Sequence, residues 1–148
     1  MWHAQAPLAG PIQASAAPKH AQPTLRARRY ARVIAPADRE KWDRLHAQRV
    51  EPAEPPAWLA EHAACLPRTG RALDIAAGAG RIAIWAAARG LDVLAVDLSG
   101  VGLARISHPR VRTLERDLEE DPRLPEGPFE LVTLFHYRQP SLAAPVHA

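Results

Sequence analysis

The sequence of 148 residues contains a single cysteine, Cys65, and no long apolar run. One cysteine excludes an intramolecular disulfide, which fits a reducing compartment, so we expect a cytoplasmic protein. The longest apolar stretch, IAIWAAA, is far shorter than the roughly 18 residues that cross a bilayer. A charged-then-apolar signal sequence is also missing. We therefore predict no association with a membrane.

Acidic residues are absent from residues 1–37, which contain five basic ones: Lys19, Arg26, Arg28, Arg29 and Arg32. The rest of the chain has more Asp and Glu than Lys and Arg, so the net charge of +3 comes from the N-terminal segment. A mildly acidic folded part gives no reason to expect nucleic acid as a partner.

Repeated prolines interrupt the same N-terminal segment and disfavour helix. We predict that residues 1–36 are a disordered, basic segment and that one domain occupies residues 37–148. An organellar transit peptide and a mis-called start are the alternatives for the first segment. Its Ala-, Arg- and Pro-rich composition suits a GC-rich bacterial genome.

Two short helices are predicted at the start of the domain. In ADREKWDRLHAQ, Trp42 and Leu45 are three residues apart among charges, as in an amphipathic helix. In EPPAWLAEHAACLP, prolines suit the helix start, and one side carries Trp58, Leu59, His62, Cys65 and Leu66. His62 and Cys65 have the spacing of metal ligands, but no second pair exists. We therefore expect core or rim residues there and no metal site.

Strand and helix patterns then alternate along the chain. Apolar runs predict strands in RALDIA, LDVLAVDLS, VRTL and FELVTLF, and residues 81–89 read as a helix ended by Gly90. Ser99 is placed to cap a further helix that Gly100 and Gly102 weaken. Such alternation predicts an α/β fold, a Rossmann-like doubly wound parallel sheet.

A glycine turn follows the first strand and suggests a nucleotide-like ligand. Gly78, Gly80 and Ala83 spell G-x-G-x-x-A, which also fits an NAD(P)-binding oxidoreductase. Asp74 favours a different ligand, because a carboxylate beside the turn would repel a diphosphate and attract a cation. Asp97 ends the second strand, where it can accept hydrogen bonds from ribose hydroxyls; its alternative use is to cap the next helix.

Four segments in order, LDIAAGAGR, AVDLS, RDLE and FELVTLF, resemble class I S-adenosylmethionine (SAM)-dependent methyltransferases. The chain is most similar to the small bacterial tellurite-resistance-type group. DREKWDRLHAQ matches that group's N-terminal helix, which carries a Trp-Asp pair followed by an aromatic residue. The resemblance covers about residues 38–142. It implies SAM as the cofactor and methyl transfer to a small-molecule acceptor.

The resemblance also implies which residues bind the cofactor. The loop around the methionine part corresponds to Asp74, Ala76, Gly78 and Gly80, with Arg81 next. Ala76 stands where the family has its first glycine. Asp97, followed by Leu98, matches the ribose-binding acid, while Asp117 and Leu118 match the adenine-binding pair. A solvated acidic cluster is the alternative for Asp117.

The resemblance leaves the catalytic residue unassigned. His136 and Tyr137 follow the fourth strand at the substrate end and are candidates for a base or an orienting group, with packing as the alternative. The segment lacks the Asn/Asp-Pro-Pro-aromatic run of amino-group methyltransferases, so nothing supports methylation of nucleic-acid bases.

The family's sheet continues beyond its fourth strand, whereas few residues follow Phe135 here, and Pro140 and Pro145 interrupt them. We therefore expect a C-terminally incomplete fold with weak or no activity, whose exposed fourth-strand edge permits self-association. A non-catalytic SAM-binding fragment that needs a partner is the alternative.

Overall fold

The computed structural model describes residues 36–48, 54–139 and 142. The helices are α2 (Pro36–Gln48), α3 (Ala57–Glu61), the 3-10 turn η1 (Ala63–Cys65), α4 (Arg81–Ala88) and α5 (Gly100–Leu103). The strands are β1 (Arg71–Ile75), β2 (Asp92–Asp97), β3 (Val111–Glu115) and β4 (Leu131–Leu134). The segment predicted to be disordered lies, apart from its last residue, outside the described residues and stays a prediction.

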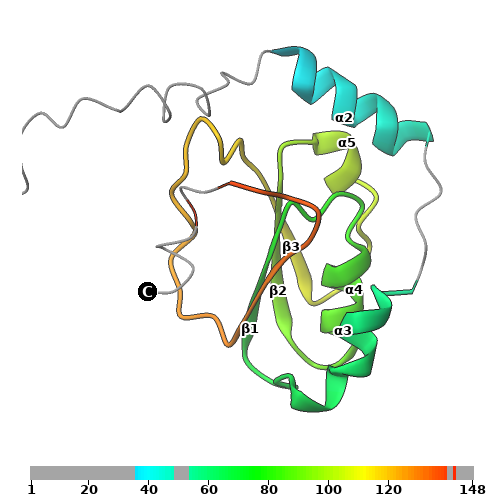
Figure 1. The fold of residues 1–148 in the computed structure, drawn as a ribbon, viewed down its shortest axis with the longest axis vertical. Helices are drawn as coiled ribbons and strands as arrows, with labels where there is room; N and C mark the ends of the chain where they lie inside the picture. The colour runs from blue at the N-terminus through cyan, green and yellow to red at the C-terminus, as the bar shows by residue number, and fades with distance from the viewer. Residues whose placement is uncertain (1–35, 49–53, 140–141, 143–148) are drawn as a thin grey trace, which may run out of the picture. The chain divides into compact units, whose positions relative to one another are not determined.

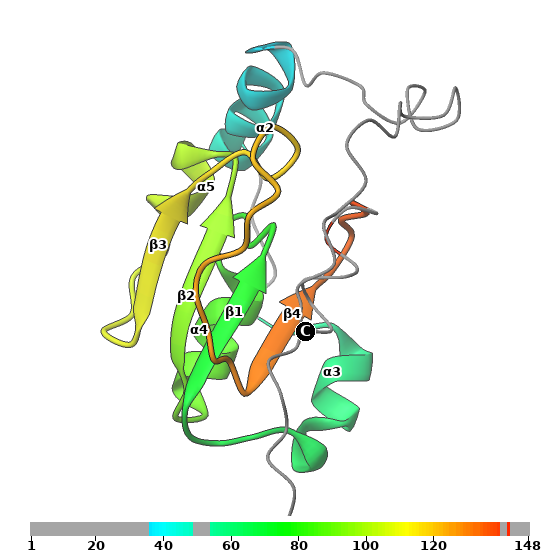
Figure 2. The ribbon, with the colours of Figure 1, turned by 90° about the vertical axis from the view of Figure 1, so that its left-hand side faces the viewer.

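The four strands form one parallel sheet (Figure 1), and Figure 2 shows them side by side in the order β3-β2-β1-β4. In β1, Asp74 lies opposite Ala95 of β2 and Thr133 of β4. Because all strands are parallel, their carboxyl ends meet at one edge of the sheet. The predicted α/β fold with a parallel sheet is confirmed.

Small side chains bring α4 close to one face of the sheet. Ala83, Ala86 and Ala87 are buried against sheet residues such as Ala72 and Ala95. Alanine favours helix and leaves little side chain between helix and strand. The helix therefore lies directly on β1 and β2, and its first turn is held at the carboxyl edge of the sheet.

The opposite face is covered by irregular chain. Leu73, Ile75 and Val96 form a second core with Leu118 and Leu142. Residues 116–130, which connect β3 to β4, run across this face without forming a helix (Figure 2). Within the described residues, a loop therefore seals the face where a doubly wound fold commonly has a helix.

The two N-terminal helices bury other residues than their patterns predicted. In α2, Trp42 is 41% and Leu45 40% exposed, whereas His46 is only 7% exposed. The pattern was wrong because α2 packs on glycine-rich backbone, which leaves room for one ring and offers no broad apolar surface.

Only Leu59 of the second predicted helix is buried. Trp58 is 59% exposed, and His62 and Cys65 are exposed as well. After Glu61 the chain passes from α3 into a 3-10 turn, which has fewer residues per turn than an α-helix. The residues predicted to share one side of a single helix therefore do not all point the same way. Among the residues that the structure describes, no three His, Cys, Asp or Glu gather as metal ligands.

The ends of the shorter elements follow their sequence signals. Ser99 caps α5, where its hydroxyl accepts a hydrogen bond from the Gly102 N–H at 3.0 Å. Gly90 takes a φ of +113° just after α4. None of the helices in the described part of the chain combines the length and apolarity needed to cross a membrane.

Candidate functional site

A cavity of about 480 Å³ opens at the carboxyl ends of the strands. It is lined by ten of the predicted site residues: Asp74, Ala76, Gly78, Arg81, Asp97, Leu98, Asp117, Leu118, His136 and Tyr137. Gly80 is the one predicted residue that does not line it. Turns that are far apart in the sequence meet here because parallel strands present their carboxyl ends to the same edge.

Asp74 lies at the floor of the cavity and is only 3% exposed. Its Oδ1 accepts a hydrogen bond from the Thr133 hydroxyl at 2.7 Å, whereas its Oδ2 has no hydrogen-bond partner among the described residues. Burial raises the pKa of Asp74 to about 7; the Thr133 hydroxyl opposes this rise, and the nearby Asp97 adds to it. A buried, unpartnered oxygen of this kind favours a ligand that brings a cation or an N–H donor.

The loop after β1 holds three residues in left-handed backbone conformations: Ala76 (φ +57°), Gly78 (φ +56°) and Gly80 (φ +82°). A Cβ on Gly78 would lie 2.8 Å from the His46 ring, and one on Gly80 would lie 2.5 Å from the Ile106 side chain. Glycine at these two positions therefore lets neighbouring side chains pack on the loop, and Gly80 shapes the site without lining it.

Asp97 joins the ends of two loops through its carboxylate. Its Oδ2 accepts a hydrogen bond from the Gly78 N–H at 2.8 Å, and its Oδ1 accepts one from the Ser99 N–H at 2.7 Å. Ser99 itself caps α5, so Asp97 is not needed for that purpose. Since each carboxylate oxygen can accept more than one hydrogen bond, both oxygens retain capacity for ligand hydroxyls on the cavity side.

Asp117 has a local structural use as well as a place in the cavity. Its Oδ1 accepts hydrogen bonds from the N–H groups of Glu119, at 2.9 Å, and Glu120, at 3.2 Å, which closes the turn after β3. Leu118 is 5% exposed and lies beside it in the wall. The turn thus presents one acid and one apolar side chain to the cavity.

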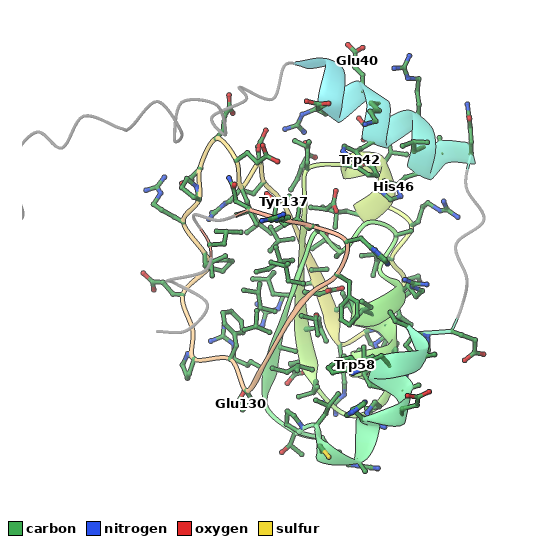
Figure 3. The ribbon with its side chains drawn as sticks, viewed as in Figure 1. Glu40, Trp42, His46, Trp58, Glu130 and Tyr137 are labelled. Carbon is green, nitrogen blue, oxygen red and sulfur yellow. The ribbon has the colours of Figure 1, made fainter. Side chains whose placement is uncertain are left out.

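Helix α2 contributes two wall residues that the sequence analysis did not assign, Trp42 and His46. Their rings stack with centroids 6.0 Å apart, and His46 lies over the Gly78 loop (Figure 3). Asp43 ties the helix to α5, because its Oδ1 accepts a hydrogen bond from the Ser99 hydroxyl at 2.6 Å. The signal that could have identified this wall is the Trp-Asp pair in the resemblance.

The residues after β4 border the cavity in two different ways. His136 is exposed and has a φ of +57°, which is uncommon for a residue with a side chain. Tyr137 is half-buried, and burial together with Glu119 and Asp117 raises the pKa of its phenol above the usual value. Tyr137 therefore keeps its proton at neutral pH, and the use of His136 or Tyr137 as a base or an orienting group stays a prediction.

Residues 72–146 match the model of a methyltransferase domain family. The chain belongs to this family. No curated protein sequence matches this methyltransferase domain. The family assignment thus decides between the two cofactor classes that the glycine turn left open, against the NAD(P)-dependent oxidoreductases.

Solved structures similar to this methyltransferase domain include three described as SAM-dependent methyltransferases. A TehB-like one from Corynebacterium glutamicum is 30% identical over 66% of this chain and 54% of its own, with a TM-score of 0.46. One from Mesorhizobium loti is 30% identical over 55% of this chain and 40% of its own, with a TM-score of 0.45. A putative one from Listeria monocytogenes is 27% identical over 50% of this chain and 38% of its own, with a TM-score of 0.41. The chain thus spans about half or less of the length of each of these three proteins.

Proposed function

We propose that this methyltransferase domain binds SAM in the cavity and transfers its methyl group to a small-molecule acceptor. The observation that carries the proposal is the buried Oδ2 of Asp74, which accepts no hydrogen bond from the part of the chain that the structure describes, while Asp74 lines the same cavity as Asp97. A ligand that joins an ammonium group to a ribose would use both carboxylates. SAM has both groups and supplies a methyl group activated by a sulfonium.

The floor of the cavity fits the amino-acid end of such a ligand. Asp74 would accept a hydrogen bond from the ammonium group, and Arg81, in the first turn of α4, would face the carboxylate. A charged pair of opposite signs on the protein thus matches a zwitterionic group. The two charges also orient the ligand, because its reversal would place like charges together.

The β2 and β3 ends of the cavity fit the adenosine part. Asp97 has oxygens available for ribose hydroxyls, and Asp117 offers an acceptor to an amino group on the base. Leu98 and Leu118 supply apolar surface for the ring. The order of the strands therefore fixes the direction in which the ligand would lie, with adenosine toward β3 and the amino acid toward β1.

Methyl transfer from a sulfonium needs the acceptor in line with the breaking bond and water kept away. Trp42 and His46 cover the glycine loop from α2, while Phe135 and His136 line the side nearest β4. The space between these two walls is where we place the acceptor. The His136 imidazole can accept a proton there if the acceptor is an amine or a hydroxyl, and it can orient an acceptor that is already anionic.

Transfer of label from methyl-labelled SAM to a panel of small thiols, amines and hydroxyl compounds tests the activity. The proposal expects at least one class to be methylated, with S-adenosylhomocysteine formed in equal amount. If SAM binds and no acceptor class is methylated, the proposal of methyl transfer is wrong, and the domain only binds SAM.

Replacing His136 by Ala should lower turnover of an amine or hydroxyl acceptor about 100-fold, because a general base typically contributes a factor of that order. An acceptor that is already anionic should be affected far less. Steady-state rates at saturating SAM measure the effect. His108, which does not line the cavity, is the matched control. Unchanged turnover of every acceptor would remove His136 from the mechanism.

A further inference from the structure

Strand β4 carries one polar residue, Thr133, in an otherwise apolar run. The pairing of β1 with β4 places Thr133 directly opposite Asp74, and Figure 2 shows these two strands side by side. Successive side chains of a strand point to opposite faces of the sheet. Leu131, two residues before Thr133, packs on the core beneath α4, whereas Val132 packs on the core of the other face. Thr133 and Asp74 therefore share the face of the sheet that α4 covers.

The hydroxyl of Thr133 is committed to Asp74. Both side chains are buried, with exposed fractions of 6% for Thr133 and 3% for Asp74. The hydroxyl has one proton to donate, and two acceptors lie within reach: Asp74 Oδ1 at 2.7 Å and the Leu73 carbonyl at 3.5 Å. Only the shorter contact has the ordinary length of a hydrogen bond between two oxygens. The proton is therefore donated to Asp74 Oδ1.

This hydrogen bond makes the two oxygens of the Asp74 carboxyl group different. Because Oδ1 accepts from Thr133, a proton bound to the carboxyl group is left with Oδ2. Oδ2 accepts no hydrogen bond within the described part of the chain. Asp74 lines the cavity, whereas Thr133 does not. Thr133 therefore reaches a ligand only through the carboxyl group of Asp74.

We propose that Thr133 is a positioning residue: its hydroxyl holds Oδ1 of Asp74, so that a proton and the ammonium group of the ligand compete for Oδ2. The part that concerns the ammonium group rests on the proposed function. The part that concerns the carboxyl group does not, because the hydrogen bond is present without a ligand. Valine favours strands as threonine does and has nearly the same shape, so the packing of β4 alone does not require a hydroxyl here.

Other groups around Asp74 act on its ionisation as well. Burial raises the pKa of Asp74 to about 7, and the Thr133 hydroxyl opposes this rise. In α4, the Ala83 N–H and the Arg81 guanidinium also oppose it, while Asp97 at the end of β2 adds to it. The remaining ionisable groups of the cavity wall come from α2, from the turn after β3 and from the chain after β4: His46, Arg116, Asp117, Glu119, His136 and Tyr137. All of these groups are kept in every Thr133 variant, so a difference between such variants reports the hydrogen bond.

An NMR titration of the carboxyl carbon of Asp74 tests the hydrogen bond without a ligand. The signal is assigned with Asp74→Asn and should titrate near pH 7 in the wild type. Thr133→Val removes the donor and should raise the midpoint by about one pH unit, the size expected for one hydrogen bond to a charged acceptor. Thr133→Ser keeps the hydroxyl and should restore the wild-type midpoint, which a residue that only fills space would not do.

Thr113→Val is the matched control for this titration. Thr113 is exposed on β3 and lies opposite Ala95, so the variant makes the same chemical change in the same sheet away from Asp74. It should leave the midpoint of Asp74 unchanged. Equal midpoints in the wild type and in Thr133→Val would overturn the inference.

Calorimetry with S-adenosylhomocysteine, in buffers of different ionisation enthalpy, tests the competition at Oδ2. Binding to the wild type should release about one proton at pH 6 and almost none at pH 8, because the ammonium group displaces the proton of a carboxyl group that titrates near 7. This measurement needs no Thr133 variant, so it decides even if Thr133→Val does not fold. Thr133→Val should bind about 3- to 10-fold more weakly than the wild type at pH 7, and the difference should narrow as the pH rises.

The failure of this inference and the failure of the proposed function give different results. If the wild type does not bind S-adenosylhomocysteine, the proposed function fails, and the NMR titration still decides whether Thr133 holds Asp74. If the wild type binds it without releasing a proton at pH 6, or if Thr133→Val binds it equally well at every pH, the proposed function stands and the inference about Thr133 is overturned.

Discussion

Ala76 carries backbone strain at the centre of the candidate site. Its φ of +57° is a left-handed conformation that residues with a Cβ adopt at a cost of about 1–2 kcal/mol. Ala76→Gly should therefore raise the free energy of unfolding by about 1 kcal/mol, the gain being reduced by the larger entropy of the unfolded glycine. Urea denaturation measures the change. Ala77 has no positive φ, so Ala77→Gly should not stabilise the protein. Equal changes in the free energy of unfolding for the two variants would show that Ala76 is not strained.

Asp74 should make the stability of the protein depend on pH. Its pKa is about 7 in the folded chain against 3.8 in the unfolded one. Below pH 3.8 the carboxyl is neutral in both states. Between pH 3.8 and about 7 the unfolded state ionises while the folded state stays protonated, so the folded state loses stability over this range, and the loss is complete above pH 7. Asp74→Asn should therefore be more stable than the wild type by about 4 kcal/mol at pH 8 and nearly equal near pH 4.

Urea denaturation at several pH values measures this difference. Asp92→Asn is the matched control, since Asp92 is exposed and its carboxylate meets the Arg110 guanidinium at 3.4 Å. A constant difference between Asp74→Asn and the wild type from pH 4 to pH 8 would show that Asp74 is not held protonated by burial.

Ionisation of Asp74 should also control binding of a cation. A positively charged ammonium group requires the carboxylate, so the affinity for SAM should increase about tenfold from pH 6 to pH 8, as expected for a group that titrates near 7. The Asp74→Asn variant should bind weakly at every pH. Calorimetry over this range measures the effect, and an affinity that falls with rising pH in the wild type would contradict an Asp74–ammonium contact.

Several polar contacts hold helix α2 on the site, and one of them, between Asp43 and Ser99, lies at its centre. The Ser99 hydroxyl donates to Asp43 and accepts from the Gly102 N–H, so one side chain both caps α5 and anchors α2. Ser99→Ala should cost about 1–2 kcal/mol through loss of the cap and of this anchor. Asp43→Ala should lower the free energy of unfolding by less than Ser99→Ala does. The double variant should lose about 1 kcal/mol less than the sum of the two single losses, because both variants remove the same hydrogen bond. Additive effects in thermal or urea denaturation would show that the two residues are not coupled.

The strands could be predicted from their own residues. The buried side of α2 could not, because it depends on residues that are distant in the sequence. Apolar runs located all four strands to within a few residues. The central strands β1 and β2 are largely buried, so their positions leave little choice of residue. The periodicity of α2 could not show that its neighbours are Gly78 and Gly102, where a Cβ would collide with the His46 ring or with backbone. His46 was therefore missed as a buried residue, and Trp42, expected on the apolar side of an amphipathic helix, is 41% exposed.

The same reasoning applies to the candidate site as a whole. Asp74, Asp97 and Asp117 could be predicted together because each lies at or close to the carboxyl end of a strand of one parallel sheet. His136 and Tyr137 were both assigned to this cavity, and both line it. That Tyr137 also packs on the second core could not be predicted, because the residues of that core are distant from it in the sequence.

At the scale of the molecule, β4 is an open edge. Within the described residues it pairs with β1 on one side and with no strand on the other. Leu134 is 37% exposed beside this edge, and the exposed Trp58 lies against Phe135 with ring centroids 6.4 Å apart. We propose that copies of the chain associate through this edge, since unpaired strand groups and apolar side chains favour pairing.

Leu134→Lys should shift the protein toward the monomer, because a charge at a strand edge opposes edge-to-edge pairing. Sedimentation velocity at increasing protein concentration measures the shift. Leu45→Lys is the control, as Leu45 is equally exposed at 40% but lies on α2. A wild type that stays monomeric at all concentrations would contradict association through β4.

Calorimetric titration of SAM into the wild type and into Asp97→Ala tests the central claim, that two strand-end carboxylates hold this ligand in one cavity. We predict one SAM site per chain, no heat from NADH, and binding by Asp97→Ala that is weaker by about 1–3 kcal/mol, the usual cost of removing a buried polar partner. Binding of NADH in place of SAM, or equal affinities of the wild type and Asp97→Ala for SAM, would contradict the account.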